Sequence, residues 1–360
     1  MTGLHIDDLL RYTIEQDCSD LHVKTGSVPT VRISGLLAKT AFPETDPAMC
    51  EELAKQMMDD DQERTLTEAG EVDFGYQAAE IGRFRVNIHR QRGTLALSAR
   101  RILPQAPEFK ELGLPEAVEA LANEHRGLLL VTGPTSSGKT TTTGAVLRHI
   151  NQTRACHILT IEDPIEILHS DERSIVTQRE VGQDTRDFST ALRAAMRQDP
   201  DVIFVGEMRD LETVKAGLQA AETGHLVIAT LHTTNATETV NRIVEFFPPH
   251  EQKQTRVAIA GSLVGVVSQR LMPKVGGGRV AAIEIMIVNG RVRELILEPE
   301  RTHEIPDIIA ESGFYGMQTF DQAVIELVKQ ELVSLDDAKS AATNPHDFEL
   351  VLKQQGVIAL

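Results

Sequence analysis

A loop rich in glycine and hydroxyl side chains carries a single lysine in the stretch GPTSSGKTTT, residues 133–142. It matches the pattern G-x-x-x-x-G-K-[ST], whose fixed positions here are Gly133, Gly138, Lys139 and Thr140. Glycine allows backbone conformations that turn several N–H groups toward one anion, and a helix that starts after the loop adds its positive end. The motif therefore predicts a nucleotide site in which Lys139 reaches the β- and γ-phosphates and the Thr140 hydroxyl binds Mg²⁺. The residues expected to contact the nucleotide are Gly133, Pro134, Thr135, Ser136, Ser137, Gly138, Lys139, Thr140 and Thr141.

Acidic side chains stand at the end of an apolar run in RQDPDVIFVGEMRD, residues 197–210. Ligands of open parallel sheets bind beyond the carboxyl ends of the strands, which is where Glu207 and Asp210 are expected. An acid next to a phosphate loop can hold the water shell of Mg²⁺, and this favours Glu207 as a residue that binds the metal through water. Asp210 fits a second role equally well, because it can cap the helix that follows.

A second apolar run, in LTIEDPIEILH at residues 159–169, ends in Glu162, Asp163 and Glu166. Hydrolysis needs a carboxylate that orients and deprotonates a water in line with the γ-phosphate, so one of these three acids is a candidate base. Asp163 precedes a proline, so shaping the turn is an alternative role for this residue.

Two histidines flank a third apolar run, in TGHLVIATLHTT at residues 223–234. His225 opens the run and His232 follows it. Two histidines on one strand beside a nucleotide site favour a role in sensing the γ-phosphate or in coupling its loss to movement. Packing is the alternative for His225.

The elements that must position these residues change in character along the chain. Residues 1–102 predict a small α+β domain, with a helix at 4–17, a polar helical stretch at 47–69 and several short strands. Prolines mark a linker at 103–116. From 117 to 275, apolar strands alternate with helices, which predicts a parallel sheet with crossover helices. Residues 276–360 are expected to form a mostly helical region.

Composition excludes several classes of function. The chain has 360 residues, 36 Lys and Arg against 53 Asp and Glu, and a net charge of −17. So acidic a chain repels phosphate backbones, which argues against nucleic acid as the main partner. The three cysteines, Cys18, Cys50 and Cys156, form no CxxC pair and are expected to be free thiols in a reducing cytoplasm. No signal-peptide pattern and no apolar stretch of about 20 residues occurs, so we expect no direct membrane insertion.

Four stretches in this order resemble the signature motifs of one family. GPTSSGKTTT, LTIEDPIE, DVIFVGEMRD and GHLVIATLHTT are similar to the Walker A, Asp box, Walker B and His box of the secretion ATPases, the hexameric motors of type II secretion and type IV pili. SDLHV, RFRVN, QRG and RLMP extend the resemblance over nearly the whole chain. It implies a PAS-like N-terminal domain and a RecA-like P-loop ATPase core with a mostly parallel sheet and a helical C-terminal region.

The resemblance is to the retraction branch, the PilT-like twitching motility ATPases. Assembly and type II secretion motors usually carry a long extra N-terminal region and a four-cysteine zinc insertion, whereas this chain starts at the small domain and has no cysteine after Cys156. The segment VRELILEPERTHEIPDII, residues 292–309, resembles a divergent form of the retraction segment AIRNLIRE. Ser136 stands where the family usually has glycine.

The resemblance also implies roles for matching positions. Glu166 would be the catalytic base with Glu162 beside it, and Glu207 would be the Walker B carboxylate. His225 and His232 would link the nucleotide state to domain position. Arginines of the small domain would reach the phosphates; those on the matching strands are Arg83, Arg85, Arg92, Arg100 and Arg101.

Together these features predict a homo-hexameric ATPase, with ATP and Mg²⁺ as cofactors, that drives type IV pilus retraction and twitching motility. It would act in the cytoplasm at the inner-membrane base of the pilus machine, on an inner-membrane platform protein. Two alternatives remain open. One is a pilus-assembly or type II secretion ATPase of the same superfamily, and the other is a slow nucleotide-dependent switch.

Overall fold

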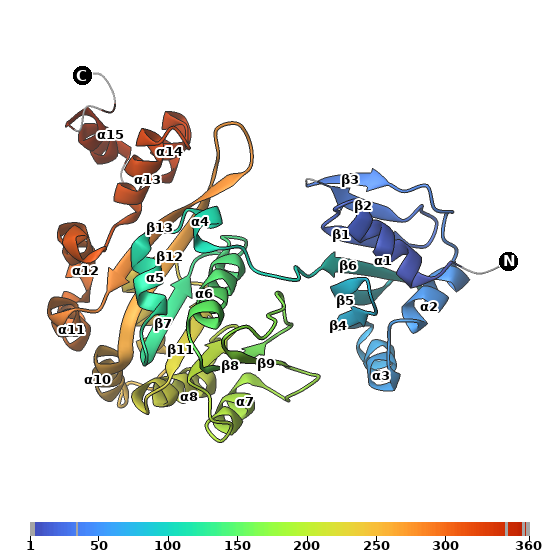
Figure 1. The fold of residues 1–360 in the computed structure, drawn as a ribbon, viewed down its shortest axis with the longest axis horizontal. Coiled ribbons are helices and arrows are strands. Elements are labelled where there is room, and N and C mark those ends of the chain that lie inside the picture. The colour runs from blue at the N-terminus through green and yellow to red at the C-terminus, as the bar shows by residue number, and fades with distance from the viewer. Residues whose placement is uncertain (1–3, 34, 343–344, 355–356, 358–360) are drawn as a thin grey trace. The chain divides into compact units, whose positions relative to one another are not determined.

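The computed structural model describes residues 4–33, 35–342, 345–354 and 357 (Figure 1). The chain divides into two compact units. The first comprises Met1–Gln105 together with Pro164–Leu168, and the second comprises Ala106–Asp163 and His169–Leu360. The domain expected at 1–102 begins with residues 1–3, and the region expected at 276–360 ends with residues 358–360. These terminal residues lie outside the described residues.

The first unit is a six-stranded antiparallel sheet with three helices. Its strands lie in the order β3-β2-β1-β6-β5-β4. Their bounds are β1 Asp20–Lys24, β2 Thr30–Ile33, β3 Leu36–Lys39, β4 Glu71–Ala78, β5 Gly82–Gln91 and β6 Thr94–Arg101. The helices are α1 Ile6–Glu15, α2 Pro47–Lys55 and α3 Asp60–Ala69.

One face of this sheet forms the core of the unit and the other face is polar. Strand β5 shows the alternation, because Phe84, Val86 and Ile88 are buried while the residues between them are partly exposed. The buried side chains pack with apolar residues of all three helices, among them Leu9, Leu53 and Leu66. The polar face is therefore the one on which Asp20, Arg32, Arg85 and Arg100 lie, because these residues stand opposite one another on neighbouring strands.

The second unit is built on a seven-stranded sheet in the order β13-β12-β7-β11-β10-β8-β9. All neighbouring strands are parallel except β12 and β13. Three of the strands, β7, β10 and β11, are buried along their whole length, as expected for a parallel sheet that is covered on both faces. The bounds are β7 Gly127–Thr132, β8 His157–Glu162, β9 Ile175–Glu180, β10 Val202–Val205, β11 Leu226–Leu231, β12 Leu263–Pro273 and β13 Arg279–Ile287.

Helices cover both faces of this sheet. Helices α5 (Glu116–Ala122) and α6 (Lys139–Thr153) pack on one face, together with Leu129 and Val131 of β7. The opposite face carries Leu128 and Leu130 and is covered by the helices α7 Phe188–Ala195, α8 Leu211–Glu222, α9 Ala236–Glu245, α10 Gln252–Ser262, α11 Gly290–Leu297 and α12 Ile305–Glu311. Three more helices form a separate cluster with the ends of β12 and β13: α13 Phe320–Lys329, α14 Leu335–Ala341 and α15 Pro345–Gln354. The remaining helical segments are α4 Phe109–Leu112, η1 Pro299–Glu304 and η2 Gly313–Tyr315.

The predicted fold class is confirmed, and three details differ from the expectations. The polar stretch at 47–69 is two helices, because the Asp59 side chain accepts hydrogen bonds from the backbone of Asp61 and Gln62 and starts a new helix there. Strand β9 was not predicted. The region from 276 onward, expected to be helical, begins with β13, whose run RVAAIEIMI pairs along its full length with β12. In the described residues no helix has both the length and the apolar character needed to cross a membrane.

Candidate nucleotide site

The glycine-rich loop joins the end of β7 to the start of α6. Gly133 and Gly138 have φ angles of 147° and 91°, in the range that favours glycine. A side chain at Gly138 would place its Cβ 2.7 Å from the Gln269 amide nitrogen, and one at Gly133 would collide with the Gln269 carbonyl oxygen. Both fixed glycines are therefore required by backbone conformation and by the close approach of β12. Ser136 adopts the same left-handed region, with a φ of 65°.

Lys139 is the first residue of α6 and turns back over the loop. Its ammonium group donates to the carbonyl oxygens of Gly133 at 2.7 Å and Pro134 at 3.1 Å. Thr140 follows on the exposed side of the helix. No side chain caps the start of α6, so its first N–H groups are available to an anion. The loop thus has the polar groups that a phosphate ligand needs.

A chain of polar contacts connects Lys139 with the acid that follows β10. The Lys139 ammonium lies 3.3 Å from Nδ1 of His232, and Nε2 of His232 lies 3.0 Å from Oε1 of Glu207. The other Glu207 oxygen accepts from Arg209 at 2.7 Å. A lysine ammonium can only donate, so Nδ1 of His232 accepts and Nε2 carries the proton donated to Glu207. The side chain of His232 therefore joins the phosphate loop to a carboxylate.

Glu207 is mostly buried, with 16% of its side chain exposed. Burial raises the pKa of this carboxyl, but the hydrogen bond and charge of Arg209 and the neighbouring His232 outweigh burial, so the pKa lies below its ordinary value. A carboxylate with a lowered pKa is a poor proton acceptor and stays charged at neutral pH. This environment suits an acid that holds the water shell of a cation better than one that removes a proton from water.

The predicted acids after β8 and β10 differ in their surroundings. Glu162 ends β8 beside β10; its Oε1 accepts from the Thr160 hydroxyl at 2.7 Å and from the Gln178 amide at 3.1 Å. Asp163 is exposed. Asp210 caps α8, because it accepts from the backbone N–H of Thr213 at 2.8 Å. Glu162 at the end of β8 and Glu207 just after β10 are thus the two acids of these neighbouring strands that are not exposed.

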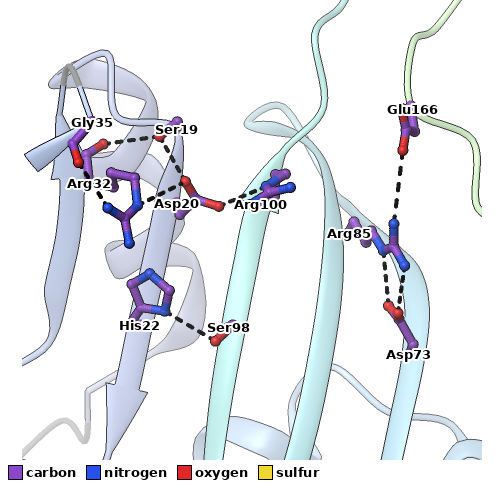
Figure 2. Close-up of polar contacts among 10 residues, drawn as sticks. All are labelled: Ser19, Asp20, His22, Arg32, Gly35, Asp73, Arg85, Ser98, Arg100 and Glu166. Carbon is purple, nitrogen blue, oxygen red and sulfur yellow. Dashed lines mark hydrogen bonds and ion pairs between the residues drawn. The ribbon is translucent and has the colours of Figure 1, made fainter. Parts of the chain in front are cut away.

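Glu166 lies in the first unit, where it contacts β5. Its Oε1 is 3.9 Å from the Arg85 guanidinium, which also makes a two-point contact with Asp73 (Figure 2). The segment around Glu166 is tied to this unit by a bridge between Ile167 and Leu103. The structure therefore places the candidate base next to an arginine of the small domain.

The other predicted arginines also lie in the first unit, on β5, β6 and the turn between them. Arg101 donates to Asp17 at 2.7 Å, and Arg100 donates to the buried Asp20 at 2.8 Å (Figure 2). The backbone oxygen of Arg83 accepts from the backbone N–H of Ile102, the residue after β6. Arg92 forms the tight turn after β5, with a φ of 50°. Arg83, Arg85, Arg100 and Arg101 thus lie on strands as predicted, whereas Arg92 lies in the turn between β5 and β6.

The structure does not bring His225 to the phosphate loop. Strands β11 and β7 are parallel, with Leu226 opposite Gly127 and Leu231 opposite Thr132. His225 therefore lies at the amino end of β11, whereas the loop and His232 lie at the carboxyl end. Its Nδ1 lies 3.0 Å from the carbonyl oxygen of Ala220 at the end of α8. Direct contact of His225 with a nucleotide on this loop does not fit this placement.

A cavity of about 1160 Å³ adjoins the Glu207 and His232 side chains. It extends between α9 and the start of α13, and its lining includes Arg209, Arg270 and Glu284. Glu284 is buried on β13 and accepts from the backbone N–H of Ala236, the first residue of α9, at 2.8 Å. This contact fixes the start of the helix that follows the His232 segment, and nothing in the local sequence pattern marked Glu284 for that position.

Replacing Glu284 with glutamine is expected to stabilise the protein at neutral and higher pH. Burial raises the pKa of the Glu284 carboxyl, the Ala236 N–H and Arg270 oppose this, and Asp321 adds to it. The folded wild-type protein therefore binds the proton on Glu284 more tightly than the unfolded chain does. The stability that this proton contributes to wild type is fully present below the unfolded-state pKa and is lost as pH rises through the raised folded-state pKa. Glutamine keeps the oxygen that accepts from Ala236 and removes the charge.

The measurement is thermal unfolding of Glu284→Gln and wild type across the acid-to-neutral range. We expect a Tm increase of about 2–4 °C at about pH 8, which disappears near the ordinary carboxyl pKa of about 4.3. A variant that is less stable than wild type at the higher pH would contradict the expectation.

The fold and the loop define this protein as a P-loop ATPase with a RecA-like core and an added small domain. Residues 4–284 match the family described as Type II/IV secretion system protein. The chain belongs to this family.

Individual relatives point to one branch of it. The chain is 43% identical over 345 residues to the type IV pilus retraction ATPase PilT of Pseudomonas aeruginosa, and the match covers 96% of this chain and all of the relative. It is 43% identical to a twitching motility protein of Neisseria gonorrhoeae, over 88% of this chain and 84% of that protein. A crystal structure of the pilus retraction motor PilT with bound ADP superposes with a TM-score of 0.89 at 46% identity, and covers 97% of this chain and 100% of that one. The predicted resemblance to PilT-like ATPases is confirmed.

Proposed function

We propose that this chain hydrolyses ATP to drive the retraction of type IV pili. The observation that carries the proposal is the contact chain from Lys139 through His232 to Glu207, which follows three neighbouring strands beside a complete phosphate loop. It contains the cation for the phosphates, the acid for the metal and a side chain between them. Family membership and the relatives named for pilus retraction and twitching motility support the biological role.

The phosphate loop binds the triphosphate through its backbone N–H groups and the start of α6, and Lys139 moves from the loop carbonyls to the β- and γ-phosphates. Thr140 and Glu207 fit a magnesium ion, because one offers an exposed hydroxyl and the other a carboxylate whose pKa is held low. When bound, Mg²⁺ neutralises charge on the phosphate oxygens. His232 donates to Glu207 and keeps its carboxylate oriented.

Glu166 is our candidate for the base that accepts a proton from the attacking water, and Glu162 is the supporting acid. Two properties support this assignment. The Glu166 side chain is 45% exposed, whereas Glu162 is buried and accepts hydrogen bonds from two neighbours. Arg83 and Arg101 are the candidates for stabilising the charge of the transition state. Since Arg85 contacts Glu166, we propose that it orients this acid.

The working assembly that we propose is a homo-hexamer at the cytoplasmic, inner-membrane base of the pilus machine, where it acts on a platform protein of that membrane. ATP drives such a motor only if it binds one domain arrangement better than another. Two of the catalytic candidates, Glu166 and Arg101, belong to the first unit, and the phosphate loop belongs to the second.

Deleting the gene in the organism that encodes it is expected to leave cells with more surface pili and without twitching motility. Pili that continue to assemble but are not withdrawn accumulate. Counting pili by electron microscopy, with a strain complemented by the intact gene as the control, tests this. Cells with few or no pili would indicate an assembly motor instead. Purified protein that binds ATP without steady phosphate release would indicate the slow switch.

A further inference from the structure

Strand β12 contributes one polar side chain to the underside of the phosphate loop. Gln269 is buried, with 3% of its surface exposed. Its amide nitrogen donates to the carbonyl oxygen of Ser137 at 2.8 Å, and its amide oxygen accepts from the Thr142 hydroxyl at 2.7 Å. A carbonyl oxygen can only accept a hydrogen bond, so the contact with Ser137 fixes which end of the amide faces the loop. Gln269 thus joins the loop to the first turns of α6.

The Ser137 contact matters because of how a phosphate loop is built. When successive N–H groups converge on an anion, the carbonyl groups of the same residues turn away from it and need donors of their own. The Gln269 amide supplies such a donor from within the fold. Leaving a buried carbonyl without a partner costs more free energy than an average hydrogen bond contributes.

The same strand also limits which residues the loop can contain. Side chains at Gly133 or Gly138 would collide with the backbone or the amide of Gln269, as described above. Next to Gln269, the Ser268 hydroxyl contacts that of Thr132 at the end of β7, at 2.9 Å. The loop is therefore held against β12 at both ends, by the Ser268–Thr132 contact before it and by the Gln269 amide near its end.

We propose that Gln269 is a positioning residue for nucleotide binding, which holds the phosphate loop in the shape that presents its N–H groups to the phosphates. This inference rests on the proposed function, because it concerns the nucleotide site assigned there. Gln269 contacts the loop only from beneath, so its loss should weaken binding of any nucleotide that uses the loop, ADP included. The chemical step, which depends on Glu207 and Glu166, should change little.

The test compares Gln269→Leu and Gln269→Glu with wild type. Leucine removes the donor, and glutamate keeps the shape while it places a carboxylate against the Ser137 carbonyl. We expect the dissociation constant for a fluorescent ADP analogue, measured with Mg²⁺, to rise about 10- to 100-fold, more for glutamate than for leucine. KM for ATP should rise in parallel, with kcat within about threefold of wild type.

Gln318→Leu is the matched control. Gln318 also donates its amide to a backbone carbonyl, that of Ile283 on β13, at 2.7 Å. Its loss should lower the unfolding temperature without changing nucleotide affinity. Thr142→Val frees the amide oxygen but leaves the donor in place, and we expect a smaller rise of about two- to threefold in the dissociation constant.

Each outcome decides the matter. Weaker binding in the Gln269 variants alone supports the proposal, and equal affinity in Gln269→Leu and Gln318→Leu overturns it. If the glutamate variant does not fold, the leucine and Thr142→Val variants still give the comparison. Wild-type protein that binds no ADP would contradict the proposed function itself, which is a separate result.

Discussion

Replacing Lys139 with alanine is expected to reduce kcat/KM for ATP hydrolysis by about 10²–10³-fold and to weaken nucleotide binding as well. The variant loses the one cation that the loop offers to the phosphates. It also loses the two donors that hold the carbonyls of Gly133 and Pro134, and the contact to His232. Steady-state phosphate release and titration with a fluorescent nucleotide measure the two effects.

Lys215→Ala is the control for this variant. Lys215 is exposed on α8, in the same unit, so its removal changes net charge equally without touching the loop. It should hydrolyse ATP as wild type does. Wild-type turnover in Lys139→Ala would show that the glycine-rich loop is not the nucleotide site.

Changing Glu207 to glutamine is expected to lower kcat by about 10²–10³-fold while nucleotide still binds. Glutamine keeps one oxygen that accepts from Nε2 of His232, but its amide nitrogen cannot accept from Arg209, and the negative charge for the metal is gone. Phosphate release with Mg²⁺ in excess, compared with the ADP dissociation constant, separates turnover from binding. A variant that turns over normally would remove Glu207 from the site.

A matched change tests whether any acid near an arginine would give this result. Glu212→Gln alters an exposed carboxylate that lies 3.5 Å from Arg193 on the neighbouring helix, and it should be silent. A pH series adds a second check. Because the folded-state pKa of Glu207 is lowered, its charge contributes stability above the ordinary carboxyl pKa, and that contribution is lost as pH falls through the lowered value. The stability difference between wild type and Glu207→Gln should shrink in the same way.

Much of the second unit could be predicted because its signals are local in the sequence. The phosphate loop follows from eight consecutive positions, and strands such as VIFV in β10 are short apolar runs flanked by polar residues. The acid after such a run lies at the carboxyl edge of a parallel sheet in any case, so Glu207 needed no further information. The phosphate loop lies at the same carboxyl edge, because it begins where β7 ends.

The remaining features depend on pairings that a single sequence does not display. Gln269 is 132 residues from Ser137, and nothing near it indicates a contact with the loop. Strand β13 was missed because its long apolar run fits a buried helix as well as a strand until β12 is known to lie beside it. His225 was grouped with His232 because both flank one strand, but a strand of six residues separates its ends widely.

The short segment Pro164–Leu168 has a consequence for how the two units can move. It belongs to the first unit although the chain on both sides belongs to the second, so the backbone crosses between them near Gln105, Asp163 and Leu168. Three covalent connections restrict the relative motion of two units more than a single connection would. Two of these crossings flank the segment that carries Glu166, and one of them lies just after Asp163. A displacement of the small domain would therefore act on the segment Pro164–Leu168, which carries Glu166 and begins two residues after Glu162 at the end of β8.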